Sequence, residues 1–453
     1  MKIIIVGLGQ TGTLLAELVS KDGHDVVVID KSKSNVNQIT NCLSVNGVCG
    51  SGASRNVLMK AGADTADAVI ALTPYDEINL LCCMMAKKCG TRYSATRLQR
   101  NDLSNDKLYF QKEFGIDCIV NSKQETALEI VRQINLPGSI KADGFFGEST
   151  AIIELTLEKQ HSWIGKSLKE IKSSIQHPML VGAVYRDSKV IIPDGNFIME
   201  PNDIVSVILP QNSVSELRQM ARRSVKNVLI VGCGTTGICL IEKLLEQKKN
   251  ITVIDHNQER CEELTELFPT IKVALGNGID MDTLYEEGIK TMDSCVSMTG
   301  SEENNLVISM FAWTCDLYSI VTRVNTPAYE KLLHKVNMDI TISPAILCAE
   351  RLMGFVRNIA VYNENGIDIK RFYRIFEGMA ESIEFIAYDN CKKLGISLMN
   401  PEFKLKKGII LGAILRGDTT IIPSGQDCIQ QGDHVVVITK PKQHLHTLND
   451  IFA

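Results

Sequence analysis

The stretch KIIIVGLGQTGTLLAEL at residues 2–18 decides the fold, because it joins an apolar run to a glycine-rich turn and then to a helical pattern. G-x-G-x-x-G between a strand and a helix is typical of a dinucleotide-binding turn. Its first glycine makes the tight turn, the second lets the backbone approach a pyrophosphate, and the third lets the helix pack against the strand. The helix N-terminus then offers free N–H groups to phosphates. We therefore expect a phosphate loop at Gly7, Gly9, Gln10, Thr11 and Gly12.

A carboxylate follows at the distance that this kind of site requires. Asp30 ends the next apolar run, VVVID, 18 residues after Gly12. A carboxylate at the end of the second strand accepts hydrogen bonds from the ribose hydroxyls. It would also repel a 2′-phosphate, so the sequence disfavours NADP. Lys31, which follows directly, is counted with the site.

The same stretch occurs twice. NVLIVGCGTTGICLIEKL at residues 227–244 repeats the first loop, and VVVID recurs as ITVID, both at an offset of 225. Further landmarks follow in the same order, first at an offset of 226, then at 222 where residues 115–122 align with 337–344, and finally at 230. This order predicts a tandem duplication over nearly the whole chain. The paired residues are Gly7 and Gly232, Asp30 and Asp255, Gly50 and Gly276, Thr73 and Thr299, Asn79 and Asn305, Arg97 and Arg323, Arg186 and Arg416, and Asp203 and Asp433.

Each copy divides into two parts of different pattern. In the first, β-branched runs at 2–6, 25–29, about 44–48 and 68–72 alternate with helical segments, which predicts a parallel sheet with right-handed crossovers. In the second, short strands are separated by Pro-Asp-Gly and Pro-Asn turns, which predicts a small α+β lobe. The expected fold is α/β: two tandem Rossmann-like domains, each followed by such a lobe. The expected boundaries are 1–136, 137–220, 225–360 and 367–453.

Bulk properties exclude several classes of protein. A net charge of −5 argues against nucleic acid as the main partner, because phosphate binding needs a basic surface. No apolar stretch approaches the ~20 residues of a spanning helix, and the first strand leaves no room for a signal peptide. The 14 cysteines include no C-x2-C pair, so we expect reduced thiols, a cytoplasmic location and no metal site.

Motifs beyond the glycine loops carry a resemblance to a known family. After the first loop come LTPYDEINLL, ATRLQ and IIPDGNFIMEPNDIVSVI, and after the second come MTGSEENNLV, VTRVNTPAY and IIPSGQDCIQQGDHVVVI. The chain resembles the RCK (also called KTN) domains, in the tandem form of the peripheral regulatory subunits of Trk potassium uptake systems. The resemblance implies a cytosolic gating subunit at the inner face of the cell membrane, acting on a separate potassium-translocating subunit of the TrkH or TrkG kind. It also implies a homodimer or homotetramer that binds NAD or NADH, or ATP or ADP.

The resemblance assigns further residues to the nucleotide sites. A threonine after the fourth strand and an arginine after the fifth lie near the ligand in the family. One departure puts adenine selectivity in doubt, since Gly-Asp after the third strand is replaced here by Gly50-Ser51 and Gly276-Asn277. The remaining expected ligand-binding residues are Thr73 and Arg97 in the first copy, and Gly232, Gly234, Thr235, Thr236, Gly237, Asp255, Thr299 and Arg323 in the second.

Two alternatives remain open. A nicotinamide-dependent oxidoreductase would need a proton donor beside the nicotinamide. Tyr388 and Lys392 have the Tyr-x-x-x-Lys spacing, but they fall in the second lobe, so we expect no catalytic residue and no enzyme activity. A scaffold with inactive nucleotide sites is the other alternative, and Ser51 and Asn277 keep it open.

The helical stretches at residues 125–134 and 345–356 carry broad apolar surfaces. Exposed surfaces of that kind mark contacts between subunits. We therefore expect them to pair across chains, with cover by the following lobe of the same chain as the alternative.

Overall fold

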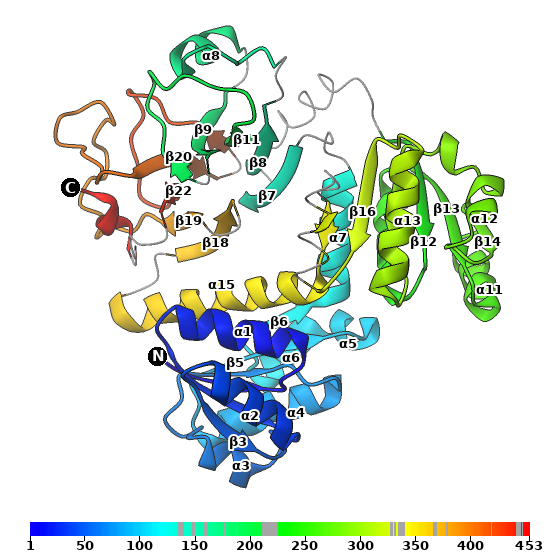
Figure 1. Cartoon of the computed structure of the whole chain (residues 1–453). Coiled ribbons are helices and arrows are strands. Elements are labelled where there is room, and N and C mark those ends of the chain that lie inside the picture. Colours follow the sequence, from blue (N-terminus) through cyan, green and yellow to red (C-terminus); the bar gives the residue numbers. More distant parts are fainter. Residues whose placement is uncertain are drawn as a thin grey trace. The chain divides into compact units, whose positions relative to one another are not determined.

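The computed structural model describes residues 1–134, 140–146, 150–157, 161–175, 178–187, 189–210, 225–326, 329, 332–333, 340–365, 369–376, 379–417, 419–440, 445 and 447–453. The chain forms two compact units (Figure 1). One contains residues 1–134, called the first half below, together with residues 225–359, called the second half. The other contains residues 135–224 and 360–453. The expected boundaries at 136–137, 220 and 367 fall outside the described residues.

The first half is a six-stranded parallel sheet in the order β3-β2-β1-β4-β5-β6, as the β–α alternation predicts. Its inner strands are apolar on both faces because helices cover both sides. The elements are β1 (Lys2–Val6), α1 (Gln10–Lys21), β2 (Asp25–Asp30), α2 (Lys33–Cys42), β3 (Asn46–Cys49), α3 (Arg55–Lys60), β4 (Ala68–Ala71), α4 (Asp76–Cys89), β5 (Tyr93–Leu98), α5 (Asn101–Asn105), α6 (Lys107–Phe114), β6 (Cys118–Asn121) and α7 (Ser122–Ile134).

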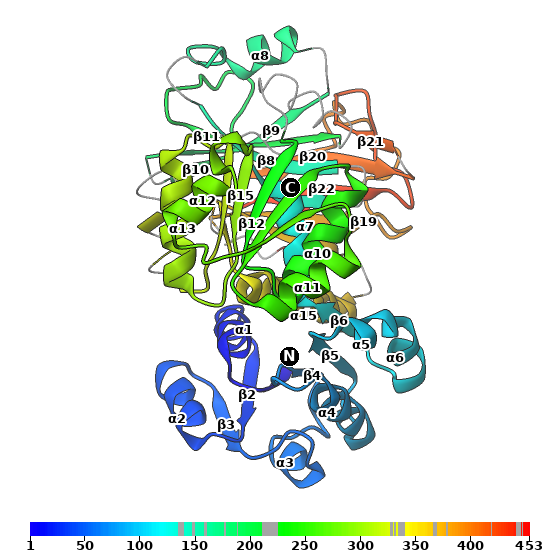
Figure 2. The ribbon, with the colours of Figure 1, turned by 90° about the vertical axis from the view of Figure 1, so that its right-hand side faces the viewer.

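The second half repeats this sheet, in the order β14-β13-β12-β15-β16-β17, and faces the viewer in Figure 2. The repeated topology confirms the fold class that the duplicated sequence predicts. The elements are β12 (Asn227–Val231), α10 (Thr235–Glu246), β13 (Asn250–Asp255), α11 (Gln258–Leu267), β14 (Lys272–Leu275), α12 (Met281–Glu286), η1 (Ile289–Thr291), β15 (Ser294–Ser297), α13 (Glu302–Thr314), β16 (Ser319–Arg323), β17 (Thr341–Ile342) and α15 (Pro344–Asn365).

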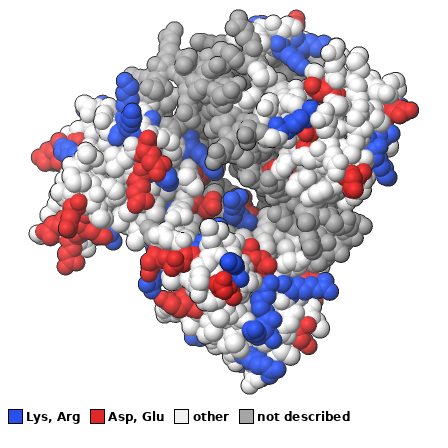
Figure 3. Space-filling view, turned by 180° about the vertical axis from the view of Figure 1, so that it is seen from behind, with Lys and Arg blue, Asp and Glu red and all other residues white. Residues whose placement is uncertain are grey.

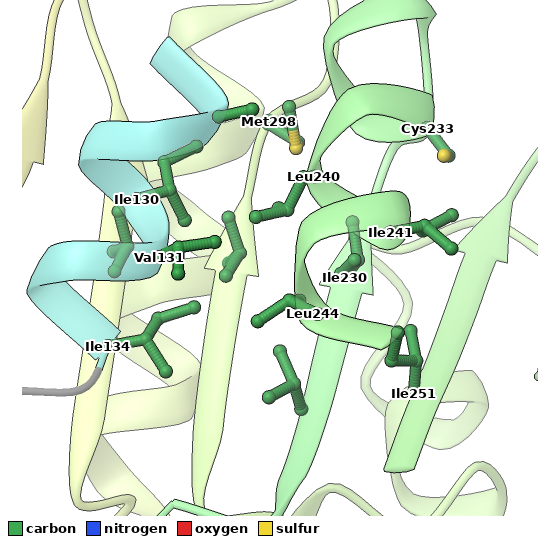
Figure 4. Packing of buried hydrophobic residues seen from close by; sticks show 14 of the residues in the cluster. Ile130, Val131, Ile134, Ile230, Cys233, Leu240, Ile241, Leu244, Ile251 and Met298 are labelled. Atoms are coloured by element: carbon green, nitrogen blue, oxygen red, sulfur yellow. The ribbon is translucent and has the colours of Figure 1, made fainter. Parts of the chain in front are cut away.

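The two halves exchange their last helices. Helix α7 of the first half packs against α10 of the second, with Ile130 and Ile134 fully buried in the second half's core (Figure 4). Helix α15 of the second half packs in turn on α1 of the first half, where Leu352 and Val356 are fully buried (Figure 1). Burying each such side chain contributes about 1.5–3 kcal/mol, so the exchange holds the two halves together.

The exchange corrects one expectation. The apolar faces of residues 125–134 and 345–356 are neither exposed for a second subunit nor assigned to a lobe; the other half of the same chain covers them. The sequence pattern shows only that something must cover an apolar helix face. It does not distinguish a neighbour in the chain from a neighbour in an assembly.

The second unit contains two five-stranded antiparallel sheets, one for each lobe, in the orders β10-β9-β11-β8-β7 and β18-β19-β22-β20-β21. They pack on each other through a shared apolar cluster that includes Ile152, Ile208 and Val436. The first lobe consists of β7 (Ile140–Phe146), β8 (Thr150–Thr156), α8 (Leu168–Ser174), β9 (Leu180–Arg186), β10 (Lys189–Ile191) and β11 (Ile204–Pro210). The second consists of β18 (Ile369–Ile375), β19 (Ala380–Ile386), β20 (Ile409–Arg416), β21 (Thr419–Ile421), β22 (His434–Thr439) and η3 (Leu448–Ile451).

Candidate functional site

The first glycine loop contains two glycines that the protein itself requires. Gly7 has φ +96°, and a Cβ there would lie 2.8 Å from the backbone of Leu72 and Thr73. A Cβ on Gly12 would lie 1.9 Å from the carbonyl oxygen of Gly7. Both positions therefore exclude any side chain for reasons of packing.

Packing does not exclude a side chain at Gly9. Its backbone is extended, with φ −77°, and a Cβ there would meet nothing within 4 Å. Gly9 directly precedes α1 and lines a cleft beside it. Gly234 before α10 repeats this arrangement, again with open space around it. A glycine that nothing in the protein requires fits the close approach of a ligand to the backbone.

The strand-end carboxylates are held in place by the backbone. Asp30 accepts one hydrogen bond from the N–H of Leu8 and one from the N–H of Ser32, each at 2.7 Å. Asp255 accepts from the N–H of Cys233 at 2.7 Å and of Asn257 at 3.0 Å. An ionised carboxylate has about four acceptor positions, so each group can still accept hydrogen bonds from a ribose.

A buried asparagine ties the threonine and arginine of each site together. In the first half, the fully buried Asn79 accepts from the N–H and the hydroxyl of Thr73, each at 2.7 Å, and donates to the carbonyl of Arg97 at 3.1 Å. These bonds fix the loop after β4 against the end of β5. In the second half, Asn305 makes the same contacts to Thr299 and Arg323.

Neither arginine has a carboxylate partner among the described residues. Arg97 donates to the hydroxyl of Thr11 and to the carbonyl of Thr73, each at 3.3 Å, while its buried Nε has no partner among the described residues. The guanidinium of Arg323 makes no hydrogen bond or ion pair within the described part of the chain. Burial lowers the pKa of Arg323, and the nearby Glu302 opposes that shift. Guanidinium groups prefer bidentate anionic partners such as phosphate, so both fit an anionic ligand.

One cleft of about 730 Å³ brings most of the expected residues together, in the size range of small-molecule sites. It lies within the unit formed by the two halves, and both halves line it. The helices α1, α7, α10 and α15 all begin at residues in its lining or directly beside it, so four positive dipole ends face it. From the first half come Gly7, Gly9, Gln10, Thr11, Asp30, Lys31, Ser51, Thr73 and Arg97, and from the second come Gly234, Thr235, Thr236 and Arg323.

Most of the charged residues that line this cleft are cations. Lys31, Arg97, Lys123 and Arg323 line it, and Asp30 is the one carboxylate among the described lining residues. A cavity lined by one sign of charge concentrates ions of the opposite sign. The lining of the cleft therefore favours an anionic ligand.

A second, smaller cavity of about 510 Å³ holds the rest of the second copy's site. Gly232, Asp255, Asn277 and Thr299 line it, with His256 where the first half has Lys31. Among the described residues that line it there is no lysine or arginine. Gly12 and Gly237 line neither cavity, because they pack the loop against its own helix.

Sequence reasoning missed several residues of the large cleft. Gln99 and Asn325 line it, each two residues after the arginine of its copy, so a repeated amide at that spacing was a usable signal. Ser122 and Lys123 at the start of α7 also line it. No repeat signal marks Lys123, since the equivalent residue of the second copy is Ala345.

Comparison with known proteins assigns the chain to a family. The TrkA-N domain model matches residues 3–122 and 228–344, and the TrkA-C domain model matches residues 152–222 and 383–453. The chain belongs to the TrkA family. In each copy a TrkA-N match is followed by a TrkA-C match, which is the order of domain and lobe that the duplicated sequence predicts.

Relatives of this TrkA-family chain match over nearly their full length. The "Trk system potassium uptake protein TrkA" of Haemophilus influenzae is 28% identical over 460 residues, which cover 100% of this chain and 98% of the relative. "TrkA homolog 1" of Methanosarcina mazei is 28% identical, over 97% of each chain. The solved structure "GsuK channel bound to NAD" is 16% identical, with a TM-score of 0.62 over 97% of this chain and 77% of that chain, which shows a shared fold.

Proposed function

We propose that this protein is a nucleotide-binding regulatory subunit of a Trk-type potassium uptake system, which controls a separate membrane subunit that conducts potassium. The observation that carries the proposal is the cation-rich cleft that both halves line, in a chain whose relatives of equal length are Trk potassium uptake proteins. A ligand held between two halves stabilises whichever of their arrangements it binds more tightly. Nucleotide binding would thereby be coupled to the state of a partner.

We propose an adenine nucleotide as the ligand, either NAD or NADH, or ATP or ADP. The structural neighbour GsuK is described as bound to NAD and, in another structure, to ADP. In this chain Asp30 would accept from the ribose hydroxyls and Gly9 would admit the phosphates. Arg97 and Arg323 would pair with phosphate oxygens. Asp255 and Asn277 would hold a nucleoside in the smaller cavity.

We propose that the chain is not an enzyme. Two pairs have the Tyr-x-x-x-Lys spacing, Tyr388 with Lys392 and Tyr185 with Lys189, and both belong to the lobe unit and not to the unit that contains the glycine loops. Purified protein should therefore not oxidise NADH with common keto acids or aldehydes. A steady absorbance change at 340 nm that Gly9→Asp abolishes would favour the oxidoreductase alternative.

We propose further that the protein acts as a homodimer or homotetramer on the cytoplasmic face of the membrane, beside a subunit of the TrkH or TrkG kind. None of the helices in the described part of the chain combines the length and apolar composition of a membrane crossing. Val307, Met310 and Trp313 expose about half of their surfaces along one face of α13, which supports association with a second copy. The four domains would span 1–136, 137–220, 225–360 and 367–453.

Potassium uptake in cells tests the proposal. Cells whose one copy of the protein carries Gly9→Asp together with Gly234→Asp should lose regulated uptake. Both positions have open space, so the fold tolerates the side chains while the added charges repel phosphate. Normal uptake with both substitutions, at equal protein levels, would contradict the proposed function.

A further inference from the structure

Lys123 occupies a position that protein stability alone does not favour. It lies in the first turn of α7, where the positive end of the helix dipole repels a cation. Its side chain is half-buried, and burial lowers the pKa of Lys123. Among the described residues it has no carboxylate within 4 Å. The charge of Asp76 favours the protonated form of Lys123, but no hydrogen bond or ion pair joins the two side chains, and Asp76 accepts from the N–H groups of Gln99 and Arg100, each at 2.8 Å.

The second half shows that the helix does not need this lysine. Helix α15 begins with Pro344 and Ala345, and Ala345 is the counterpart of Lys123. Both helices pack on the opposite half, and both line the cleft at their first turn. An alanine therefore serves the same structural position, and the lysine adds only a cation.

The surroundings of Lys123 do not supply the missing partner. Three other cations line the same cleft, Lys31, Arg97 and Arg323, and Asp30, the one carboxylate among the described lining residues, forms no ion pair with Lys123. Like charges around one cavity raise the free energy of the protein without ligand. An anion bound between these cations replaces their mutual repulsion with attraction to the ligand.

We propose that Lys123 is a ligand-binding residue, whose ammonium contacts the phosphates of the nucleotide that the first loop holds. This inference rests on the proposed function, since it assigns a further residue to the same cleft. Lys123 belongs to the first half by sequence but sits on a helix packed against α10 of the second half. A phosphate that contacts both Lys123 and the loop after β1 therefore links the two halves through one ligand. The second copy, with Ala345, supplies no equivalent contact.

Calorimetric titration of the full chain with ATP, ADP and NADH tests the assignment. Lys123→Ala should weaken binding by about tenfold to a hundredfold, the range of a hydrogen bond to a charged group. Lys123→Arg should retain most of the affinity because it keeps the charge. Lys107→Ala is the matched control, since Lys107 is an exposed lysine in the first turn of α6 that does not line the cleft. It should leave the affinity unchanged.

Thermal unfolding without nucleotide separates this role from a structural one. Lys123→Ala removes an unpaired cation from a helix N-terminus, so the unfolding midpoint should stay the same or rise. The inference is overturned if Lys123→Ala binds every nucleotide within twofold of the native protein, or if its midpoint falls and Lys123→Arg does not restore binding. If the native protein binds none of the three probes, the proposed function fails as well.

Discussion

The first and second halves share one scaffold and differ in charge. The residues that shape each loop recur in both, including Gly7 with Gly232 and Asn79 with Asn305, in the same contacts. The balance of charged residues does not recur. The first half carries 15 Lys and Arg against 14 Asp and Glu, and the second carries 12 against 18. Figure 3 shows acidic side chains gathered on the second half, at the left of the view.

The difference continues inside the sites. The first half supplies three of the four cations of the large cleft, whereas the second half's own cavity has no lysine or arginine among its described lining residues. Lys31 is matched by His256, and Lys123 by Ala345. We therefore propose that the first half would provide the main phosphate site, and that the second half would contribute Arg323 and its loop to it. The residues that hold the loops recur in both halves, whereas two cations of the large cleft, Lys31 and Lys123, have no lysine or arginine counterpart in the second copy.

The largest expected effect is on stability, and it concerns the third glycine of each loop, Gly12 and Gly237. Gly12→Ala would place a methyl group 1.9 Å from the backbone oxygen of Gly7, which cannot move without disrupting the turn. Gly237→Ala meets the Sγ atom of Cys233 at 2.5 Å, and that side chain can rotate. We expect losses of about 3 kcal/mol and about 1 kcal/mol in the free energy of unfolding, respectively. Urea unfolding measures both, and equal losses would contradict the account of the two turns.

The next effect concerns affinity. Asp30→Ala should weaken nucleotide binding by about 1.5–3 kcal/mol, the scale of hydrogen bonds to a charged group. Asp255→Ala should affect this binding event far less, because Asp255 lines the cavity without cations. Calorimetric affinities of both variants show which half holds the main nucleotide site. A larger loss from Asp255→Ala would reverse the assignment of the main site.

A smaller effect tests the exchanged helices. Arg357 on α15 donates two hydrogen bonds to Asp22 at the end of α1, at 2.6 and 2.9 Å, and both side chains are largely buried. Arg357→Ala should cost about 1–2 kcal/mol of stability. Lys21→Ala removes the neighbouring exposed pair with Glu17 and should cost under ~0.5 kcal/mol. If the two substitutions cost the same in thermal unfolding, the contact between α15 and the first half is not as described.

The smallest effect on stability concerns association. Trp313 exposes 54% of its surface on α13, whereas the equivalent residue of the first half is Lys87, which pairs with Asp117 at 2.7 Å. Trp313→Glu should change the unfolding midpoint little, since few buried contacts are lost. It should shift the mass seen by light scattering towards the monomer. An unchanged assembly would place the subunit contact elsewhere.

Much of the fold and of the candidate site could be predicted from the sequence, and the parts that could not be predicted depend on contacts between distant segments. The loops, the parallel sheets and the strand-end carboxylates follow from local patterns of glycine, apolar runs and turns, and these patterns occur twice. The exchange of α7 and α15 does not follow, because an apolar helix face does not specify which surface covers it. Lys123 was missed for a related reason: its importance depends on what lies across the cleft, and that is set by the exchange.

Equilibrium binding of nucleotide to the native chain and to Gly9→Asp tests the central claim most directly. Gly9 is the loop position that has open space around it and faces the large cleft, so the substitution should leave the unfolding midpoint unchanged. The account predicts that the native protein binds an adenine nucleotide and that Gly9→Asp does not. Equal affinity for the two proteins would contradict it.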